Sequence, residues 1–304
     1  MRAPIRIVTL VLALLTMQAP SASSYDPPPA SSALLRGIDF TSATPLDEDY
    51  RREFQGCDGV LGAARKDRFR GFRLSGDYRC STDPSRVKTL LKLKDGAIYW
   101  ESKLALDLDG SWASWSGTVW RGANGRPLKT TDLCGTSLKW QSHGGNDCDH
   151  PEAQVDSDQY PFIVIPTAGL RRITGRQSAK IGREFRDKTG LDMKDMGVVI
   201  YRDKWSPVFI ADGGPFMRLG EGSARLFETL DESRCKKWNS DGTRCVGPGD
   251  SEYPYRNFGL SSKVIFIIYP GSRSATLSPE TAIAEICAFA ERKLGLTGST
   301  VCNR

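Results

Sequence analysis

Two carboxylates lie on either side of a glycine-rich bend, and they are the first candidates for catalytic residues in this sequence. Asp212 ends the apolar run SPVFIA, and Glu221 follows nine positions later, where we expect a helix to begin near Gly222. Two carboxyl groups facing each other across a groove can hydrolyse a glycosidic bond, because one protonates the leaving oxygen while the other activates water or attacks directly. Structural roles also fit: aspartate is common before a Gly-Gly turn, and acids are frequent in the first turn of a helix.

The order of motifs around this pair resembles the core of glycoside hydrolase family 75, the fungal-type chitosanases. VVIY, SPVFIADGGP and RLGEGS follow the family pattern of a short strand pair, Gly-Asp-x-Gly-Pro and Gly-Glu-x-Ser. Upstream, SKLALDLDG and YPFIVIP resemble its acidic strand end and its next apolar strand, so the similarity runs in order from about residue 97 to 270. The resemblance implies an inverting enzyme with Asp212 as base and Glu221 as proton donor.

The chain departs from the family pattern at three positions. Ala211 replaces the glycine before the aspartate, Gly222 follows the glutamate where alanine is frequent, and Ala105 replaces the first of three alternating acids. A helix N-terminus also lowers the pKa of a nearby carboxyl, whereas a general acid needs a raised pKa. Either burial raises the pKa of Glu221 by more than the helix N-terminus lowers it, or the roles of the two carboxylates are exchanged.

Chitosan is a polycation at mildly acidic pH, so we expect acids and aromatic rings around its binding site. Asp107 and Asp109 are candidates to pair with glucosamine ammonium groups, although DLDG also reads as a turn or as half of a calcium loop with too few ligands. Trp100, in a tryptophan-rich segment, and Tyr255 are candidates to contact the sugars. We expect no metal and no cofactor.

The cysteines and the N-terminal residues indicate export. Residues 1–24 combine basic residues, the apolar run IVTLVLALL and a small-residue stretch, which is typical of a signal peptide. All eight cysteines lie beyond it, and an even number in an exported chain favours disulfides. We expect sequential pairing: 57–80, 134–148, 235–245 and 287–302. The only histidines, His143 and His150, lie in a loop with Cys148, which favours loop residues over a zinc site.

Composition excludes several classes of partner. Removal of the signal peptide leaves 40 basic and 36 acidic residues, without a long run of either sign. Nucleic-acid binding therefore has little support, and no segment beyond the signal is apolar enough to span a membrane. We expect a monomer whose partner is a polysaccharide.

The hydrophobic pattern predicts a mainly β protein with a few peripheral helices. Partial alternation of apolar and polar residues predicts a strand over 97–110, and short apolar runs predict strands over 161–166 and 263–270. The residues from Gly197 to Gly214 predict a hairpin. Helices are predicted from Thr44 to Gly56 and from Ser278 to Gly295. The family resemblance implies a barrel-like sheet related to double-psi β-barrels.

These observations predict a secreted, disulfide-bonded hydrolase. We expect a signal peptide over 1–24, a Pro/Ser-rich leader over 25–40 and one catalytic domain over 41–304. The expected activity is endo-hydrolysis of the β-1,4 bonds of chitosan. Two alternatives stay open: a secreted polysaccharide-binding protein without activity, and a hydrolase of another amino-sugar polymer on the same scaffold.

Overall fold

A computed structural model describes most of the chain from residue 29 onward. The described residues are 29–46, 68–69, 72–73, 87–122, 124–128, 135–140, 150–167, 176–214, 219–256 and 259–303. The predicted signal peptide and the predicted disulfides 57–80 and 134–148 lie outside the described residues, as does most of the helix predicted after Thr44.

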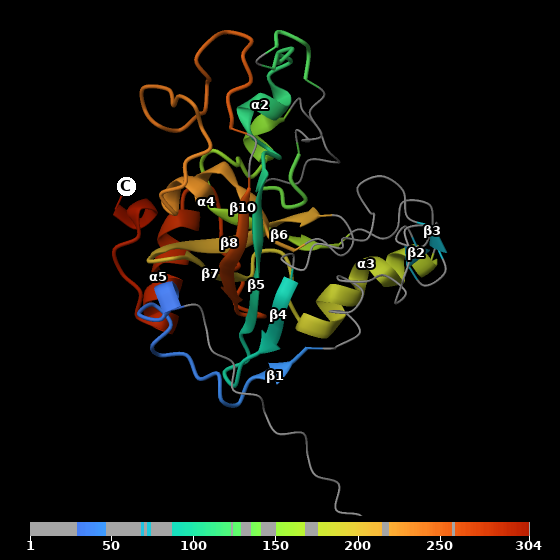
Figure 1. The fold of residues 1–304 in the computed structure, drawn as a ribbon, viewed down its shortest axis with the longest axis vertical. Coiled ribbons are helices and arrows are strands. Elements are labelled where there is room, and N and C mark those ends of the chain that lie inside the picture. The colour runs from blue at the N-terminus through green and yellow to red at the C-terminus, as the bar shows by residue number, and fades with distance from the viewer. Residues whose placement is uncertain are drawn as a thin grey trace, which may run out of the picture.

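Six strands form a closed barrel, which confirms the prediction of a mainly β, barrel-like fold (Figure 1). In order around the ring these are β5 (Ile98–Asp107), β10 (Leu260–Ile268), β7 (Met196–Tyr201), β8 (Lys204–Gly214), β6 (Phe162–Pro166) and β9 (Glu221–Ser223). The ring closes because β9 pairs with β6 on one edge and with β5 on the other. The relation to double-psi barrels stays a prediction.

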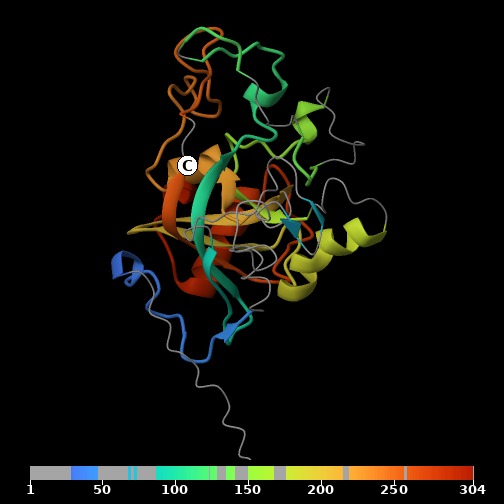
Figure 2. The same cartoon turned by 45° about the vertical axis from the view of Figure 1, so that its right-hand side comes forward.

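Three of the barrel strands are those that the apolar runs predict, and two more form the predicted hairpin. β7 and β8 pair from Met196–Phe209 to Tyr201–Lys204, and Arg202 adopts a left-handed φ of 57° at the turn. All pairings in the ring are antiparallel except β5–β9 and β6–β8. In Figure 2, β5 curves along the front of the barrel while β7 and β8 run crosswise behind it.

Outside the ring, β4 (Val87–Lys92) shares one edge of β5 with β9. β4 pairs with the first half of β5, up to Ser102, and β9 pairs with the last three residues. β1 (Thr44–Pro45) continues the sheet beyond β4, and β2 (Arg68–Phe69) and β3 (Phe72–Arg73) form a separate pair. The helix predicted to start at Thr44 is therefore wrong at its first residues, because both are held in extended conformation by pairing with β4.

Helices lie around the barrel. These are α2 (Trp112–Trp115), α3 (Arg176–Thr189), α4 (Ala224–Thr229), α5 (Ala282–Leu294) and the 3-10 turns η1 (Pro29–Ser31), η4 (Pro151–Ala153) and η5 (Thr300–Asn303). The predicted C-terminal helix is confirmed as α5; it buries Ile286, Phe289 and Ala290 and ends at Gly295, whose φ is 64°. Among the described residues, no helix has the length and apolarity that a membrane crossing requires.

The barrel wall buries apolar side chains on both of its faces. Neighbouring residues of β8 separate into two clusters: Phe209 packs with α5 residues, whereas Ile210 packs with Leu226 and Phe227 of α4. β6 is buried along its whole length. This double burial explains why β6 and the second half of β10 are continuous apolar runs rather than alternating patterns.

The segment predicted as a leader packs partly on the barrel. Ser31 and Leu35 are 1% and 3% exposed, and the Ser31 hydroxyl donates to the Arg202 carbonyl at 2.9 Å. Leu34, Ile38 and Phe40 pack on the same cluster as Leu35. The folded unit therefore begins before residue 41, because apolar anchors within the Pro/Ser-rich segment bind it to the core.

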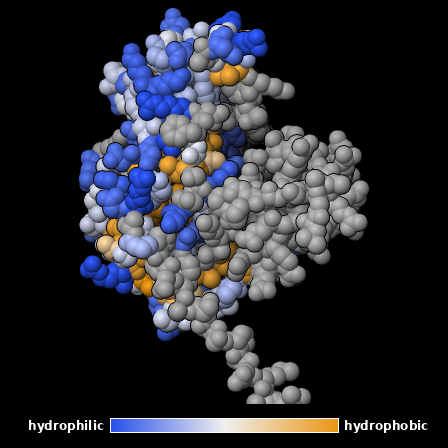
Figure 3. All heavy atoms as spheres, in the orientation of Figure 1, coloured by the Kyte–Doolittle hydropathy of each residue, from blue (hydrophilic) through white to orange (hydrophobic). Residues whose placement is uncertain are grey.

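Two of the predicted disulfides are present. Cys235–Cys245 closes a loop after α4, and Cys287–Cys302 joins α5 to η5. The first belongs to the upper lobe, which we define as residues 112–128 and 235–256. Its two segments meet where Arg121 bridges to Glu252, and where the rings of Trp120 and Tyr253 lie 6.4 Å apart. Figure 3 shows that the visible face of this lobe is mainly hydrophilic.

Candidate functional site

The register of the sheet places Asp212 and Glu221 in one row of residues. Val164 of β6 is the direct partner of Asp212 on β8 and of Glu221 on β9, and Glu221 also pairs with Ala105 of β5. Directly paired residues project to the same face of a sheet. The two Cα atoms are thus two strand spacings, about 10 Å, apart with their side chains on a common face.

A local irregularity in β8 turns Asp212 toward this face. The register between β6 and β8 shifts after Ile163, so that Ala211 is an extra residue between the paired positions. Such bulges redirect side chains, and they are frequent beside functional sites. A chain without the extra residue would project Asp212 to the opposite face.

Hydrogen bonds fix the Asp212 carboxylate. Its Oδ1 accepts from the backbone N–H of Ser137 at 2.8 Å, from the Ser137 hydroxyl at 2.5 Å and from the Gly213 N–H at 2.7 Å. Asp212 as a whole residue is 6% exposed.

Glu221 lies in a strand rather than in the first turn of a helix, which corrects the expectation from the sequence. The helix begins three residues later at Ala224, capped by Ser223, whose hydroxyl accepts from the Leu226 N–H at 3.1 Å. Glu221 leans across β6 toward β8: its Oε2 lies 3.2 Å from the position that a Cβ on Gly214 would occupy.

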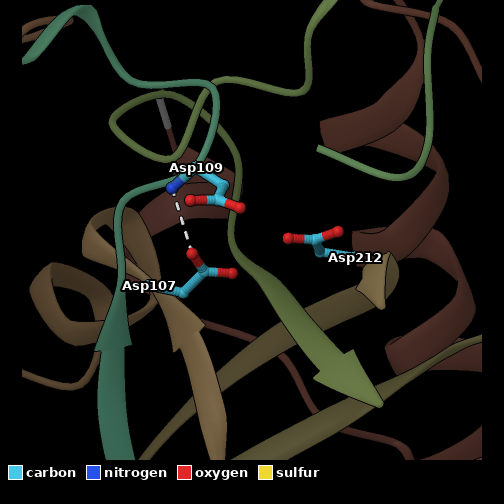
Figure 4. Close-up of side chains that lie close together, drawn as sticks. All are labelled: Asp107, Asp109 and Asp212. Atoms are coloured by element: carbon cyan, nitrogen blue, oxygen red, sulfur yellow. Dashed lines mark hydrogen bonds between the residues drawn. The ribbon is translucent and has the colours of Figure 1, made fainter. Parts of the chain in front are cut away.

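Asp107 and Asp109 come from the end of β5 and meet Asp212 from the other side of the site (Figure 4). One carboxylate oxygen from each of the three residues lies within 4.8 Å of the other two. The chain leaves β5 in a tight turn, in which Asp107 Oδ1 accepts from the Asp109 N–H at 3.0 Å. Gly110 completes the turn with a φ of 75°, where a Cβ would lie 2.5 Å from the Val155 carbonyl oxygen.

Burial and like charge dominate the electrostatics of this group. Burial, followed by the charges of Asp109 and Asp212, raises the pKa of Asp107 well above its usual value, and the charge of Glu221 adds to the shift. The hydrogen bond from the Asp109 N–H opposes it. The four carboxylates predicted as site residues thus form one electrostatic group, although they lie on three strands and a turn.

The two aromatic residues predicted to contact sugar do not reach the site. Trp100 is fully buried and stacks on Phe266 with ring centroids 4.8 Å apart. Tyr255 is 2% exposed, and its hydroxyl donates to Asp158 Oδ1 at 2.9 Å. A fully buried ring has no face to offer to a ligand, so both predictions are corrected.

Other tryptophans of the same segment remain partly exposed. Trp112 and Trp115 of α2 are half-buried and lie against Arg244, whose guanidinium carbon is 5.5 Å and 5.8 Å from their ring centroids. α2 follows the Asp107–Gly110 turn almost directly in the chain and lies in the upper lobe (Figure 1).

Sequence reasoning missed Ser137. This residue is 75 positions from Asp212, and the TSL stretch around it has no pattern that points to a site. The Leu138 N–H donates to the Ala211 carbonyl at 2.8 Å, so backbone pairing next to the bulge brings Ser137 to the carboxylate.

Comparisons with known proteins do not assign a family. No protein-family model matches the sequence, and a search of curated proteins gave no significant match. Any function of this chain must therefore be argued from its own residues and their geometry.

Proposed function

We propose that the protein is a secreted, chitosanase-like glycoside hydrolase that cleaves β-1,4 linkages with inversion at the anomeric carbon. Asp212 is the base and Glu221 the proton donor. The observation that carries the proposal is the shared row: both carboxylates project from one face, with Val164 between them.

Inversion is the outcome that the family resemblance implies, and it requires a wider gap between the two acids than retention does. Inverting pairs stand about 6.5–9.5 Å apart to leave room for a water molecule, whereas retaining pairs stand about 5–5.5 Å apart. Two strand spacings give about 10 Å between the Cα atoms, and the lean of Glu221 toward β8 shortens the gap between the carboxyl groups.

The roles follow from what the two side chains can do. Asp212 Oδ1 accepts three hydrogen bonds, and this fixed acceptor geometry suits a group that orients a water molecule and removes its proton. Glu221 projects from β9, the short strand that closes the barrel, and the family resemblance implies the role of proton donor for it.

The substrate class follows from the surrounding acids. Asp107 and Asp109 supply two further carboxylates beside Asp212, and a glucosamine ammonium group would pair with them. The half-buried rings of Trp112 and Trp115 supply surfaces for sugar stacking nearby in the chain. Neutral glucans offer these acids no positive charge, so we expect chitosan to be preferred to cellulose.

Export to an oxidising compartment is part of the proposal. The disulfides Cys235–Cys245 and Cys287–Cys302 are of the kind that persists outside the reducing cytosol. The signal-like residues 1–24 agree with this location.

The direct test measures new reducing ends from chitosan, chitin and cellulose oligomers. We expect activity on chitosan, with Asp212→Asn and Glu221→Gln each lowering kcat by about 10³-fold or more, since each removes a group that acts in the transition state. Asp203→Asn, an exposed change in the turn at the opposite end of β8, is the matched control. Full activity in either site variant, with folding verified by circular dichroism, would refute the assignment.

A further inference from the structure

We propose that Asp107, Asp109 and Asp212 form a binding site for a hard divalent cation, with Ca²⁺ as the best fit. The site goes beyond the proposed hydrolase function, and it would exist whether or not the protein cleaves a polysaccharide. The turn after β5 offers too few ligands by itself, and the structure adds the third carboxylate from β8.

The spacing of the carboxylates suits a single ion. Ca²⁺ binds oxygen at about 2.3–2.6 Å, so two of its ligands cannot be more than about 5.2 Å apart. One oxygen from each aspartate lies within 4.8 Å of the others, which satisfies this limit for all three pairs at once. Figure 4 shows the carboxylates of Asp109 and Asp212 directed toward the same space.

A second observation points to a ligand in this space. Asp107 is 8% exposed, and its Oδ2 has no hydrogen-bond donor among the residues that the structure describes. Its other oxygen is occupied by the Asp109 N–H, and Figure 4 shows the remaining oxygen on the side that faces Asp212. A buried carboxylate oxygen without a donor is costly, and a cation would satisfy it.

The donor set selects the class of ion. All three ligands are carboxylate oxygens, which hard cations such as Ca²⁺, Mg²⁺ and Mn²⁺ prefer, whereas zinc sites use mainly sulfur and nitrogen. Ca²⁺ accepts irregular geometry and completes its coordination with water or backbone oxygens, while Mg²⁺ demands a near-ideal octahedron. Side chains that come from a turn and a bulged strand fit the more tolerant ion.

The cation and the proposed base would compete for one residue. Asp212 cannot orient a water for attack while it is bound to a divalent ion, so Ca²⁺ is expected to inhibit hydrolysis if the proposed function is correct. Binding itself is measured without any sugar, so failure of one proposal leaves the other testable.

The test is calorimetric titration of the chelator-treated full protein with CaCl₂, and with MgCl₂ for comparison. We expect one Ca²⁺ site with weaker Mg²⁺ binding, and at least a tenfold loss of Ca²⁺ affinity in Asp107→Asn and in Asp109→Asn. Asp203→Asn, which removes an exposed acid outside the site, should bind as the wild type does.

Thermal unfolding with and without CaCl₂ gives a second readout, since a ligand that binds only the folded state raises the unfolding temperature. Asp109 is half-buried, so Asp109→Asn is the site substitution that we expect to disturb folding least. Two results would overturn the proposal: no heat and no thermal shift at millimolar Ca²⁺, or wild-type affinity in a folded Asp109→Asn variant.

Discussion

The Asp212 carboxylate is held by a residue that is distant in sequence. Ser137 contributes two of its three hydrogen bonds, one from the backbone N–H and one from the hydroxyl. In the proposed mechanism Ser137 is therefore a positioning residue, which would act on substrate only through Asp212. Its hydroxyl also accepts from the Gly213 N–H at 3.0 Å, which ties the orientation of the carboxylate to the bend after β8.

Ser137→Ala tests this positioning role. Hydrogen bonds to charged groups contribute about 1.5–3 kcal/mol, so we expect kcat on chitosan to fall by about tenfold to a hundredfold, with a smaller change in KM. Steady-state kinetics on a chitosan oligomer measures the effect, with Ser240→Ala at an exposed position as the control. An unchanged kcat would show that the backbone N–H bonds suffice to orient Asp212.

A second buried acid, Asp158, makes the stability of the fold depend on pH. This dependence does not involve the four carboxylates of the candidate site. Burial, and next the charge of Asp156, raise the pKa of Asp158 to about 7, against opposing hydrogen bonds from the Cys245 N–H and the Tyr255 hydroxyl and the charge of Arg225. An aspartate in an unfolded chain has a pKa of about 3.9. Between these values the folded protein holds a proton that the unfolded chain has released, so stability falls as the pH rises through this window.

Asp158→Asn should remove this contribution, because the asparagine side chain does not titrate, while its amide oxygen can still accept from the Cys245 N–H. We expect the wild type to lose on the order of 2 kcal/mol more stability than the variant between pH 5 and pH 8. Chemical denaturation at several pH values measures the difference. Asp203→Asn should keep the wild-type slope, and parallel slopes in wild type and Asp158→Asn would contradict the assignment.

Residue identities were predictable where a local motif carries them. Asp107, Asp109, Asp212 and Glu221 were named from sequence, and the structure brings them together. Ser137 was not predictable, because only the folding of a loop against β8 makes it a neighbour of Asp212. The predictions that Trp100 and Tyr255 contact sugar are wrong, because composition indicates an aromatic-rich segment without indicating which rings face the core.

At the scale of elements, β9 is the short strand on which barrel closure depends. Gly220 precedes it with a φ of 81°, and a Cβ there would lie 1.9 Å from the Lys103 carbonyl oxygen. The Gly220 carbonyl accepts from the Ala105 N–H at 2.7 Å, which joins β9 to β5 next to Glu221. Glycine is required here both for its left-handed backbone and for the close approach of two strands.

Gly220→Ala should therefore destabilise the protein by about 3 kcal/mol or more, from the left-handed conformation plus a clash with backbone that cannot move freely. Thermal or urea unfolding measures the loss. Gly249→Ala is the matched control, because a Cβ there meets nothing within 4 Å and its φ is not left-handed. Equal stability of the two variants would mean that the β5–β9 contact is not tight in solution.

Elements with strong local signals were predicted well. β6, β10, the β7–β8 hairpin and α5 follow from apolar runs, a polar turn and a helix stop. β9 is three residues long and is defined by pairing partners on two other strands, so no window of sequence could indicate it. At Thr44–Pro45 a local signal is present but misleading: the residues suit a helix start, yet pairing with β4 holds them in a strand.

At the scale of the molecule, the disulfide Cys287–Cys302 ties the C-terminal residues to α5. It closes a loop of sequence separation 15, for which restriction of the unfolded chain contributes about 3 kcal/mol. Replacing both cysteines with serine should lower the free energy of unfolding by about that amount, measured by urea denaturation. A loss under about 1 kcal/mol would indicate that the bond restricts the unfolded chain little.

Closure of the barrel could not be derived from the sequence, which gives strands but not their neighbours. The resemblance to family 75 supplied the expectation of a barrel, and the pairing of β9 with both β5 and β6 provides it. Proline and serine dominate the composition of the segment predicted as a leader, while a few apolar residues such as Leu35 determine where its described part packs.

We propose that Asp212 and Glu221 act together on one glycosidic bond with a water molecule between them. Proton NMR of chitosan oligomer hydrolysis tests it most directly, by identifying which anomer of the new reducing end forms first. Inversion at a β-1,4 bond predicts the α-anomer first, with β-anomer appearing later by mutarotation. First formation of the β-anomer, or no hydrolysis by the folded wild-type protein, would contradict the account.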